Sequence, residues 1–263
     1  VGAFRAELID APKGACGDNY CNAGYFGNYT EQGEAFTLPA GHLAADLTAQ
    51  SKWVRHYIQE RGRIEGEKAV FDSYTWTYLN PMCGKTVSVL LVRDGAASIQ
   101  EVQELPQCDY AVAGIPVLRG GQKATMAQGW DKSSLRATHH IFVGLNGDGR
   151  IHVLGMETKG VNLLDSGEAA EQLAARGYTD VIKLDGGGSY VVRSDAVGAT
   201  TGGDRRICSI IRLGSTAWGG VEKPEEPEDP GYEQWKAYME RYRAELAGQT
   251  AAMPELLEEA VSM

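Results

Sequence analysis

The order of elements in the middle of the chain constrains the fold more than any other feature. Residues 139–145 (HHIFVGL) and 150–154 (RIHVL) are apolar runs separated by Asn-Gly-Asp-Gly, which tolerates the positive φ of a tight hairpin turn. A helix over 166–176, ended by Gly177, then leads to a strand at 181–184. This order predicts an α+β domain around a mixed, largely antiparallel sheet with a few packed helices.

Other segments extend the same pattern. Residues 3–9 alternate weakly and residues 87–92 (VSVLLV) are continuously apolar, so both predict strands, as do residues 207–213. Residues 46–61 carry an apolar helical face ahead of Gly62, which predicts a helix that stops at this glycine.

A change of composition divides the chain of 263 residues into three parts. Residues 1–220 have the apolar content of a domain with its own core. Residues 221–231 (VEKPEEPEDPG) are acidic and rich in proline, which predicts an extended linker. In residues 232–263 apolar side chains recur at helical spacing, so a C-terminal helical tail is expected.

Charge and hydropathy limit the partners. The net charge is −10 and no dense cluster of Lys and Arg occurs, so a nucleic-acid polymer is not expected as a ligand. The apolar runs are too short for a membrane span. No signal peptide is visible after Val1; the Glu-Pro linker and the lack of eukaryotic processing signals favour an extracellular, cell-surface or phage-associated setting.

The five cysteines show no CxxC spacing, which argues against a zinc site and against a disulfide scaffold. Two interpretations stay open: one bridge between Cys16 and Cys21, or buried free thiols throughout.

The string Asp185-Gly186-Gly187-Gly188-Ser189 is the strongest candidate for a site. Three glycines after a strand let successive N–H groups converge into a nest for an anion, and the carboxylate beside them can act as acid or base. The alternative is a tight turn in which the aspartate merely caps its own backbone.

Taken with other motifs, this string resembles the phosphodiester glycosidase family. Residues 184–189 (LDGGGS) match the family's most characteristic motif, and residues 21–26 (CNAGYF) are similar to its Asn-Gly-Gly-Phe-Phe segment. Residues 113–121 (AGIPVLRGG) resemble its Gly-Pro-x-Leu-x-x-Gly segment, and residues 204–207 (DRRI) resemble its Glu-Arg-Pro-Val element. The resemblance covers most of residues 5–215.

The resemblance implies hydrolysis of a sugar-1-phosphodiester of the N-acetylglucosamine-1-phosphate type on the sugar side, releasing free sugar and a phosphomonoester. Such a reaction needs a carboxylate near the anomeric carbon and positive or N–H groups around the phosphate. Asp185 is the expected catalytic carboxylate, as base or nucleophile, and Glu157 is the second candidate. The resemblance further implies a backbone nest at Gly186, Gly187 and Gly188. It implies phosphate contacts from Arg205, His140 and Lys159. Asn22 and Ser189 would bond the sugar or orient the carboxylate.

Two positions depart from the family. The chain has His139-His140 where the family usually has Arg-Thr, and residues 157–159 (ETK) where the family shows Asp-Gly-Arg. Lysine keeps the charge of arginine but loses its bidentate fork, and the charge of a histidine depends on pH. We therefore expect a divergent member, in which Asn22 and His140 also have purely structural readings. A divalent cation held by the two histidines and Asp185 is left open.

Two other functions remain. A carbohydrate- or phosphate-binding module of a phage or cell-surface assembly would keep the fold without turnover. A nucleotide or nucleotide-sugar site is the weaker alternative, because no Walker or dinucleotide motif is present.

Overall fold

The computed structural model describes residues 4–72, 86–124, 139–147, 150–156, 166–193, 198–200 and 203–213. The helices of these segments are α1 (Lys52–Arg61) and α2 (Ser166–Ala175), with single 3₁₀ turns η1 (Lys13–Ala15) and η3 (Gly187–Ser189). The strands are, in chain order, β1 (Arg5–Pro12), β2 (Tyr20–Asn22), β3 (Phe26–Glu31), β4 (Glu34–Pro39), β5 (Leu43–Leu47), β6 (Arg63–Glu65), β7 (Lys68–Phe71), β8 (Val87–Arg93), β9 (Ala96–Val102), β10 (Tyr110–Arg119), β11 (Gln122–Lys123), β12 (His140–Leu145), β13 (His152–Met156), β14 (Asp180–Lys183), β15 (Val191–Arg193), β16 (Gly198–Thr200) and β17 (Arg206–Arg212).

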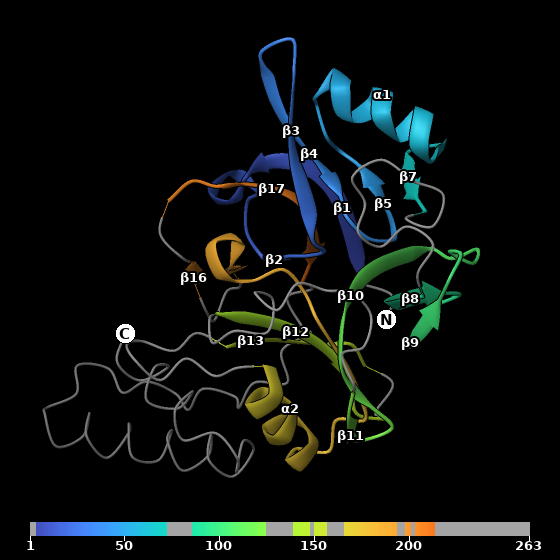
Figure 1. Cartoon of the computed structure of the whole chain (residues 1–263), viewed down its shortest axis with the longest axis vertical. Helices are drawn as coiled ribbons and strands as arrows, with labels where there is room; N and C mark the ends of the chain where they lie inside the picture. The colour runs from blue at the N-terminus through green and yellow to red at the C-terminus, as the bar shows by residue number, and fades with distance from the viewer. Residues whose placement is uncertain are drawn as a thin grey trace, which may run out of the picture.

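One large sheet dominates the molecule (Figure 1). Its main path runs β13-β12-β14-β10-β5-β1-β17-β2-β15-β16, and five further strands branch from it. Every pairing is antiparallel except that between β1 and β5. The long strand β10 joins both halves, because it pairs with β5 and β8 near its start and with β14 further along. The sheet curves into a near-barrel.

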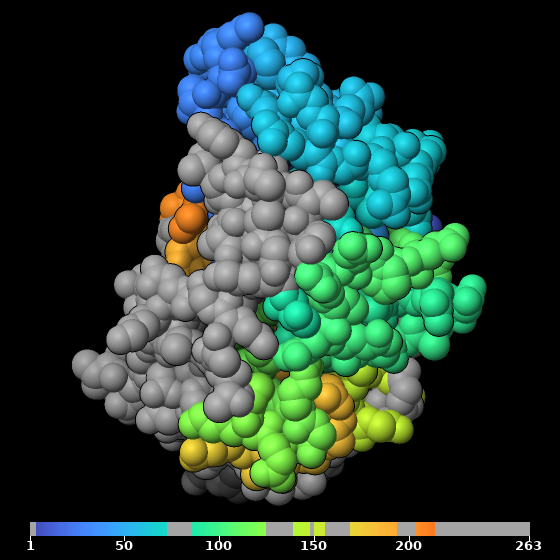
Figure 2. All heavy atoms as spheres, turned by 45° about the vertical axis from the view of Figure 1, so that its right-hand side comes forward, coloured from blue at the N-terminus to red at the C-terminus, as the bar shows by residue number. Residues whose placement is uncertain are grey.

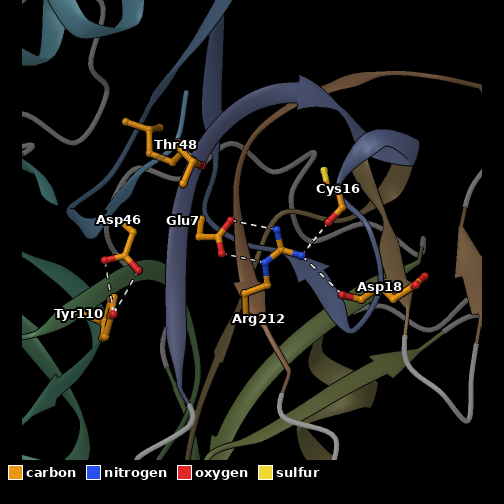
Figure 3. Close-up of polar contacts among 8 residues, drawn as sticks. Glu7, Cys16, Asp18, Asp46, Thr48, Tyr110 and Arg212 are labelled. Carbon is orange, nitrogen blue, oxygen red and sulfur yellow. Dashed lines mark hydrogen bonds and ion pairs between the residues drawn. The ribbon is translucent and has the colours of Figure 1, made fainter. Parts of the chain in front are cut away.

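The first and last described strands are held together by charge as well as by the backbone. β1 and β17 pair antiparallel, with Arg5 opposite Arg212. The Arg212 guanidinium donates to both carboxylate oxygens of Glu7, at 2.8 and 3.0 Å, and to the carbonyl of Cys16 at 2.6 Å (Figure 3). A bidentate pair of this kind fixes register as well as adding free energy.

The two helices cover opposite ends of the sheet (Figure 1). On α2, Ala169, Ala170 and Leu173 are buried against a cluster that includes Phe142 of β12 and Val181 of β14. At the other end the β3–β4 hairpin projects beside α1, and the blue and cyan surface of Figure 2 shows these elements forming the top of the molecule.

Aromatic rings join that hairpin to α1. Phe36 stacks between Tyr29 and Tyr57, with ring centroids 5.7 and 5.6 Å apart. Offset aromatic contacts at these separations add to the free energy gained by burial.

Most predicted elements are confirmed. The hairpin of β12 and β13, the helix α2 and the strands β1, β8, β14 and β17 lie where the sequence predicts them. The prediction of a mixed, largely antiparallel sheet is confirmed. The predicted α+β class is corrected, because the described segments are mostly β, with two short helices.

The helix predicted over 46–61 is wrong at its start, because residues up to Leu47 belong to β5 and α1 begins at Lys52. β5 is held between β1 and β10, so sheet pairing overrides the helical spacing of Asp46 and Leu47. Gly62 ends the helix as predicted, with its N–H donating to the Ile58 carbonyl at 2.9 Å.

The structure decides between the two cysteine alternatives within its described segments, but it does not test the predicted C-terminal parts. The four described cysteines, Cys16, Cys21, Cys108 and Cys208, are free thiols, so the bridge between Cys16 and Cys21 is not formed. The predicted linker and C-terminal helical tail lie outside the described residues. No helix in the described segments has both the length and the apolarity to cross a bilayer.

Candidate functional site

The site is built around the glycine turn, which we define as residues 185–190. Asp185 comes two residues after the end of β14. Gly187 to Ser189 then form the 3₁₀ turn η3, closed by the N–H of Tyr190 donating to the Gly187 carbonyl at 3.0 Å. The chain leaves in β15, so the turn reverses direction within a few residues.

Each glycine of the turn has its own steric reason. A Cβ on Gly186 would lie 2.3 Å from the His139 carbonyl oxygen, closer than any real contact. Gly187 has φ of +55°, which side chains disfavour. A Cβ on Gly188 would lie 3.2 Å from Nη1 of Arg205. The glycines therefore allow close approach of β12 and of the arginine.

The N–H groups of the turn are used within the protein. The N–H of Gly187 donates to the His139 carbonyl at 2.9 Å, and that of Ser189 donates to the Gly186 carbonyl at 3.1 Å. The N–H of Gly186 bonds the Asp185 carboxylate and lowers its pKa. The N–H groups of Gly186, Gly187 and Ser189 thus bond to the turn, to His139 and to the adjacent carboxylate.

Asn22 ties the two ends of the glycine turn together. Its side-chain Nδ2 donates to the Asp185 carbonyl, and its Oδ1 accepts the N–H of Val191 at 3.0 Å. Asn22 is 1% exposed, so these bonds are shielded from water. The N–H of Asp185 donates to the Ala23 carbonyl at 3.1 Å and adds a third tie. This geometry positions the aspartate through its backbone.

The Asp185 side chain is recessed in the surface but retains some exposure. Burial raises its pKa from 3.8 to about 6. Four groups oppose this rise without cancelling it: the Ser189 hydroxyl, the Arg205 guanidinium, the Gly186 N–H and the Lys183 ammonium. A carboxylate with a pKa near the operating pH is suited to proton transfer.

Ser189 and Arg205 differ in their exposure to solvent. Ser189 is 0% exposed, and its Oγ makes no hydrogen bond of good geometry, although the hydroxyl lies close enough to lower the pKa of Asp185. Arg205 is exposed, and its guanidinium stacks 5.5 Å from the centroid of the Phe26 ring. The arginine is therefore the cation that faces solvent beside Asp185.

His140 is the first residue of β12, which pairs with the strand that leads to Asp185. Phe142 pairs with Lys183, so these two share a face of the sheet, and the alternation of side chains along β12 puts His140 on the same face. His140 is 0% exposed and its ring centroid is 5.4 Å from that of Phe142. The histidine is therefore buried rather than placed at the surface.

Three residues near Asp185 were not selected from the sequence: Lys13, Tyr25 and Lys183. Burial and the charge of Asp185 raise the pKa of Tyr25 well above its ordinary range, which keeps the hydroxyl protonated. Lys183 could have been found, because it precedes Asp185 by two residues in a predicted strand. Lys13 lies far away in sequence and gave no comparable signal.

Two candidates, Glu157 and Lys159, lie outside the described residues. Within the described segments, no group of three or more His, Cys, Asp or Glu side chains is arranged to hold a metal ion.

No protein-family model matches the chain, and no curated protein matches it. Distant structural similarity links it to a hypothetical protein from Synechocystis, with a TM-score of 0.43 and 11% identity over 80% of this chain and 56% of that one. A second similar structure is the catalytic domain of zebrafish N-acetylglucosamine-1-phosphodiester alpha-N-acetylglucosaminidase, auto-inhibited by its pro-peptide. Its TM-score is 0.41, with 13% identity over 80% of this chain and 88% of that domain.

Proposed function

We propose that this protein hydrolyses a sugar-1-phosphodiester on the sugar side, with Asp185 as the catalytic carboxylate. The observation that carries the proposal is the setting of Asp185: a recessed carboxylate with a pKa of about 6, beside an exposed arginine and a fixed turn. The motif resemblance described above supports the same reaction class.

The chemistry suits these residues. The bond between the anomeric carbon and the phosphate oxygen breaks, and the phosphate leaves with the bonding electrons as an anion. Water supplies the new hydroxyl, either directly with Asp185 taking its proton or after Asp185 has formed a glycosyl ester. Arg205 balances the charge that develops on the leaving phosphate. Because a phosphate is a good leaving group, a strong general acid is not required.

The ionisation of Asp185 gives the expected pH dependence. Its carboxylate must be deprotonated to act as base or nucleophile, and its pKa is about 6. Activity should therefore fall as the pH drops below about 6, with roughly tenfold lower turnover for each further pH unit once the group is mostly protonated.

Release of free sugar from a panel of sugar-1-phosphodiesters, UDP-N-acetylglucosamine included, tests the proposal. The wild type should release sugar, and Asp185→Asn should lower the rate by about 10³-fold. Loss of activity with EDTA would add a metal ion to the reaction. Folded wild-type protein that binds a panel member without releasing sugar would instead identify a carbohydrate- or phosphate-binding module.

A further inference from the structure

Lys13 is a buried lysine directly beneath the glycine turn. It begins the 3₁₀ turn η1 after β1 and is 2% exposed. Its backbone is fixed on both sides: its N–H donates to the Arg205 carbonyl at 3.0 Å, and its carbonyl accepts the Tyr20 hydroxyl. The position of the lysine is therefore set by the same segment that carries the exposed arginine.

The side chain of Lys13 reaches the turn itself. Its Nζ donates to the Gly188 carbonyl at 3.1 Å. Arg205 also approaches this glycine, because a Cβ added to Gly188 would lie only 3.2 Å from Nη1 of Arg205. One glycine is thus flanked by two cations, one buried and one exposed.

The two cations repel each other. Burial lowers the pKa of Lys13, the nearby Arg205 lowers it further, and Asp204 partly opposes both effects. Keeping a buried lysine charged beside a second cation costs free energy. An anion bound at Gly188 would lower that cost.

We propose that Lys13 and Arg205 form an anion subsite across Gly188, with Arg205 contacting the anion and Lys13 acting from beneath as a positioning residue. The ligand class is a phosphate ester, and in the proposed function it is the phosphate of the sugar phosphodiester. The assignment of this phosphate to the subsite rests on the proposed function, whereas the binding of an anion does not.

Inorganic phosphate is the probe, titrated by calorimetry into the full chain. Lys13→Gln retains an N–H donor for the Gly188 carbonyl but removes the charge. The variant therefore tests the effect of the charge on anion binding while the hydrogen bond that supports the turn is kept. It should weaken phosphate binding about tenfold, whereas Lys13→Arg should stay within about threefold of the wild type. Lys52→Gln, at an exposed lysine on α1, is the matched control and should change nothing.

Arg205→Gln provides the second variant, because Arg205 is exposed and its replacement should leave the fold intact. It should also weaken phosphate binding at least tenfold. Unchanged phosphate affinity in folded Lys13→Gln, or in Arg205→Gln, would overturn the subsite, as would a wild type that binds no phosphate at millimolar concentration. Binding of neutral N-acetylglucosamine should be the same in wild type and Lys13→Gln, which a general loss of structure would not allow.

The outcomes separate this subsite from the proposed function. Sugar release by the wild type with unchanged phosphate affinity in Lys13→Gln would sink the subsite alone. Weakened phosphate binding in the variants, with no sugar released from any substrate, would sink the proposed reaction and keep the subsite.

Discussion

Two arginines of this protein lie beside carboxylates from distant parts of the chain, and they are used in opposite ways. Arg212 is saturated: it binds both oxygens of Glu7 and the carbonyl of Cys16, and its hydrogen bonds to Glu7 raise its pKa (Figure 3). Arg205 packs on Phe26, and in the described segments no ion pair joins it to Asp185. The charges of the first arginine and its carboxylate stabilise the fold, whereas the second arginine is exposed and, among the described residues, forms no ion pair with the nearby carboxylate.

The glycine turn should be the most sensitive part of the site. Gly186→Ala would put a Cβ 2.3 Å from the His139 carbonyl oxygen, so the turn must move away from β12. We expect a loss of about 3 kcal/mol in the free energy of unfolding, measured by urea denaturation. Gly188→Ala is the matched control, because its Cβ would meet only the end of the flexible Arg205 side chain. Equal losses in both variants would contradict this steric account.

Replacing Arg212 should lower stability, whereas replacing Arg205 should weaken substrate binding. Arg212→Met leaves the partly buried Glu7 without its partner, so the free energy of unfolding should fall by about 2 kcal/mol. Arg205→Met removes an exposed cation and should change that free energy by less than about 0.5 kcal/mol, while raising KM for a phosphodiester substrate about tenfold. If Arg205→Met instead unfolded the protein with sugar release intact per folded molecule, Arg205 would be structural.

Loss of the hydrogen bonds made by Asn22 should have a smaller effect on stability. Asn22→Ala leaves the Val191 N–H and the Asp185 carbonyl without their side-chain partner. A buried polar group without a partner costs about 1–3 kcal/mol, so the variant should be about 1.5 kcal/mol less stable. Sugar release should fall more than phosphate binding, because the carboxylate is displaced while the cations stay. A variant with full activity at lower stability would show that the tie serves only the fold.

The sequence predicts the part of the site that is local. Asp185, its glycines and Lys183 belong to one strand and turn, whose spacing and composition are visible in a short window. The hairpin of β12 and β13 and the helix α2 are predicted for the same reason.

What the sequence does not predict depends on distant pairing. Lys13 reaches Gly188 only because β1 pairs with β17, which brings η1 beside Arg205. The start of α1 was misplaced because β5 is fixed by neighbours on both sides. The direction of the N–H groups in the glycine turn also depends on tertiary contact, since the carbonyl of His139, the residue before β12, accepts one of them.

Folding holds Asp185 as a carboxylate at a cost in stability. Because the pKa in the folded protein, about 6, is above 3.8, the folded state binds the proton more tightly than the unfolded chain. Stability from this group is complete below pH 4 and is lost as the pH rises through 6, by about 3 kcal/mol for a shift of about two units.

The direct measurement is the free energy of unfolding of wild type and Asp185→Asn by urea denaturation from pH 4 to pH 8, with the exposed Asp18→Asn as control. We expect Asp185→Asn to be more stable than wild type by about 3 kcal/mol at pH 8, with the difference closing toward pH 4, and Asp18→Asn to follow the wild type. An Asp185→Asn variant no more stable than wild type at pH 8 would contradict this expectation.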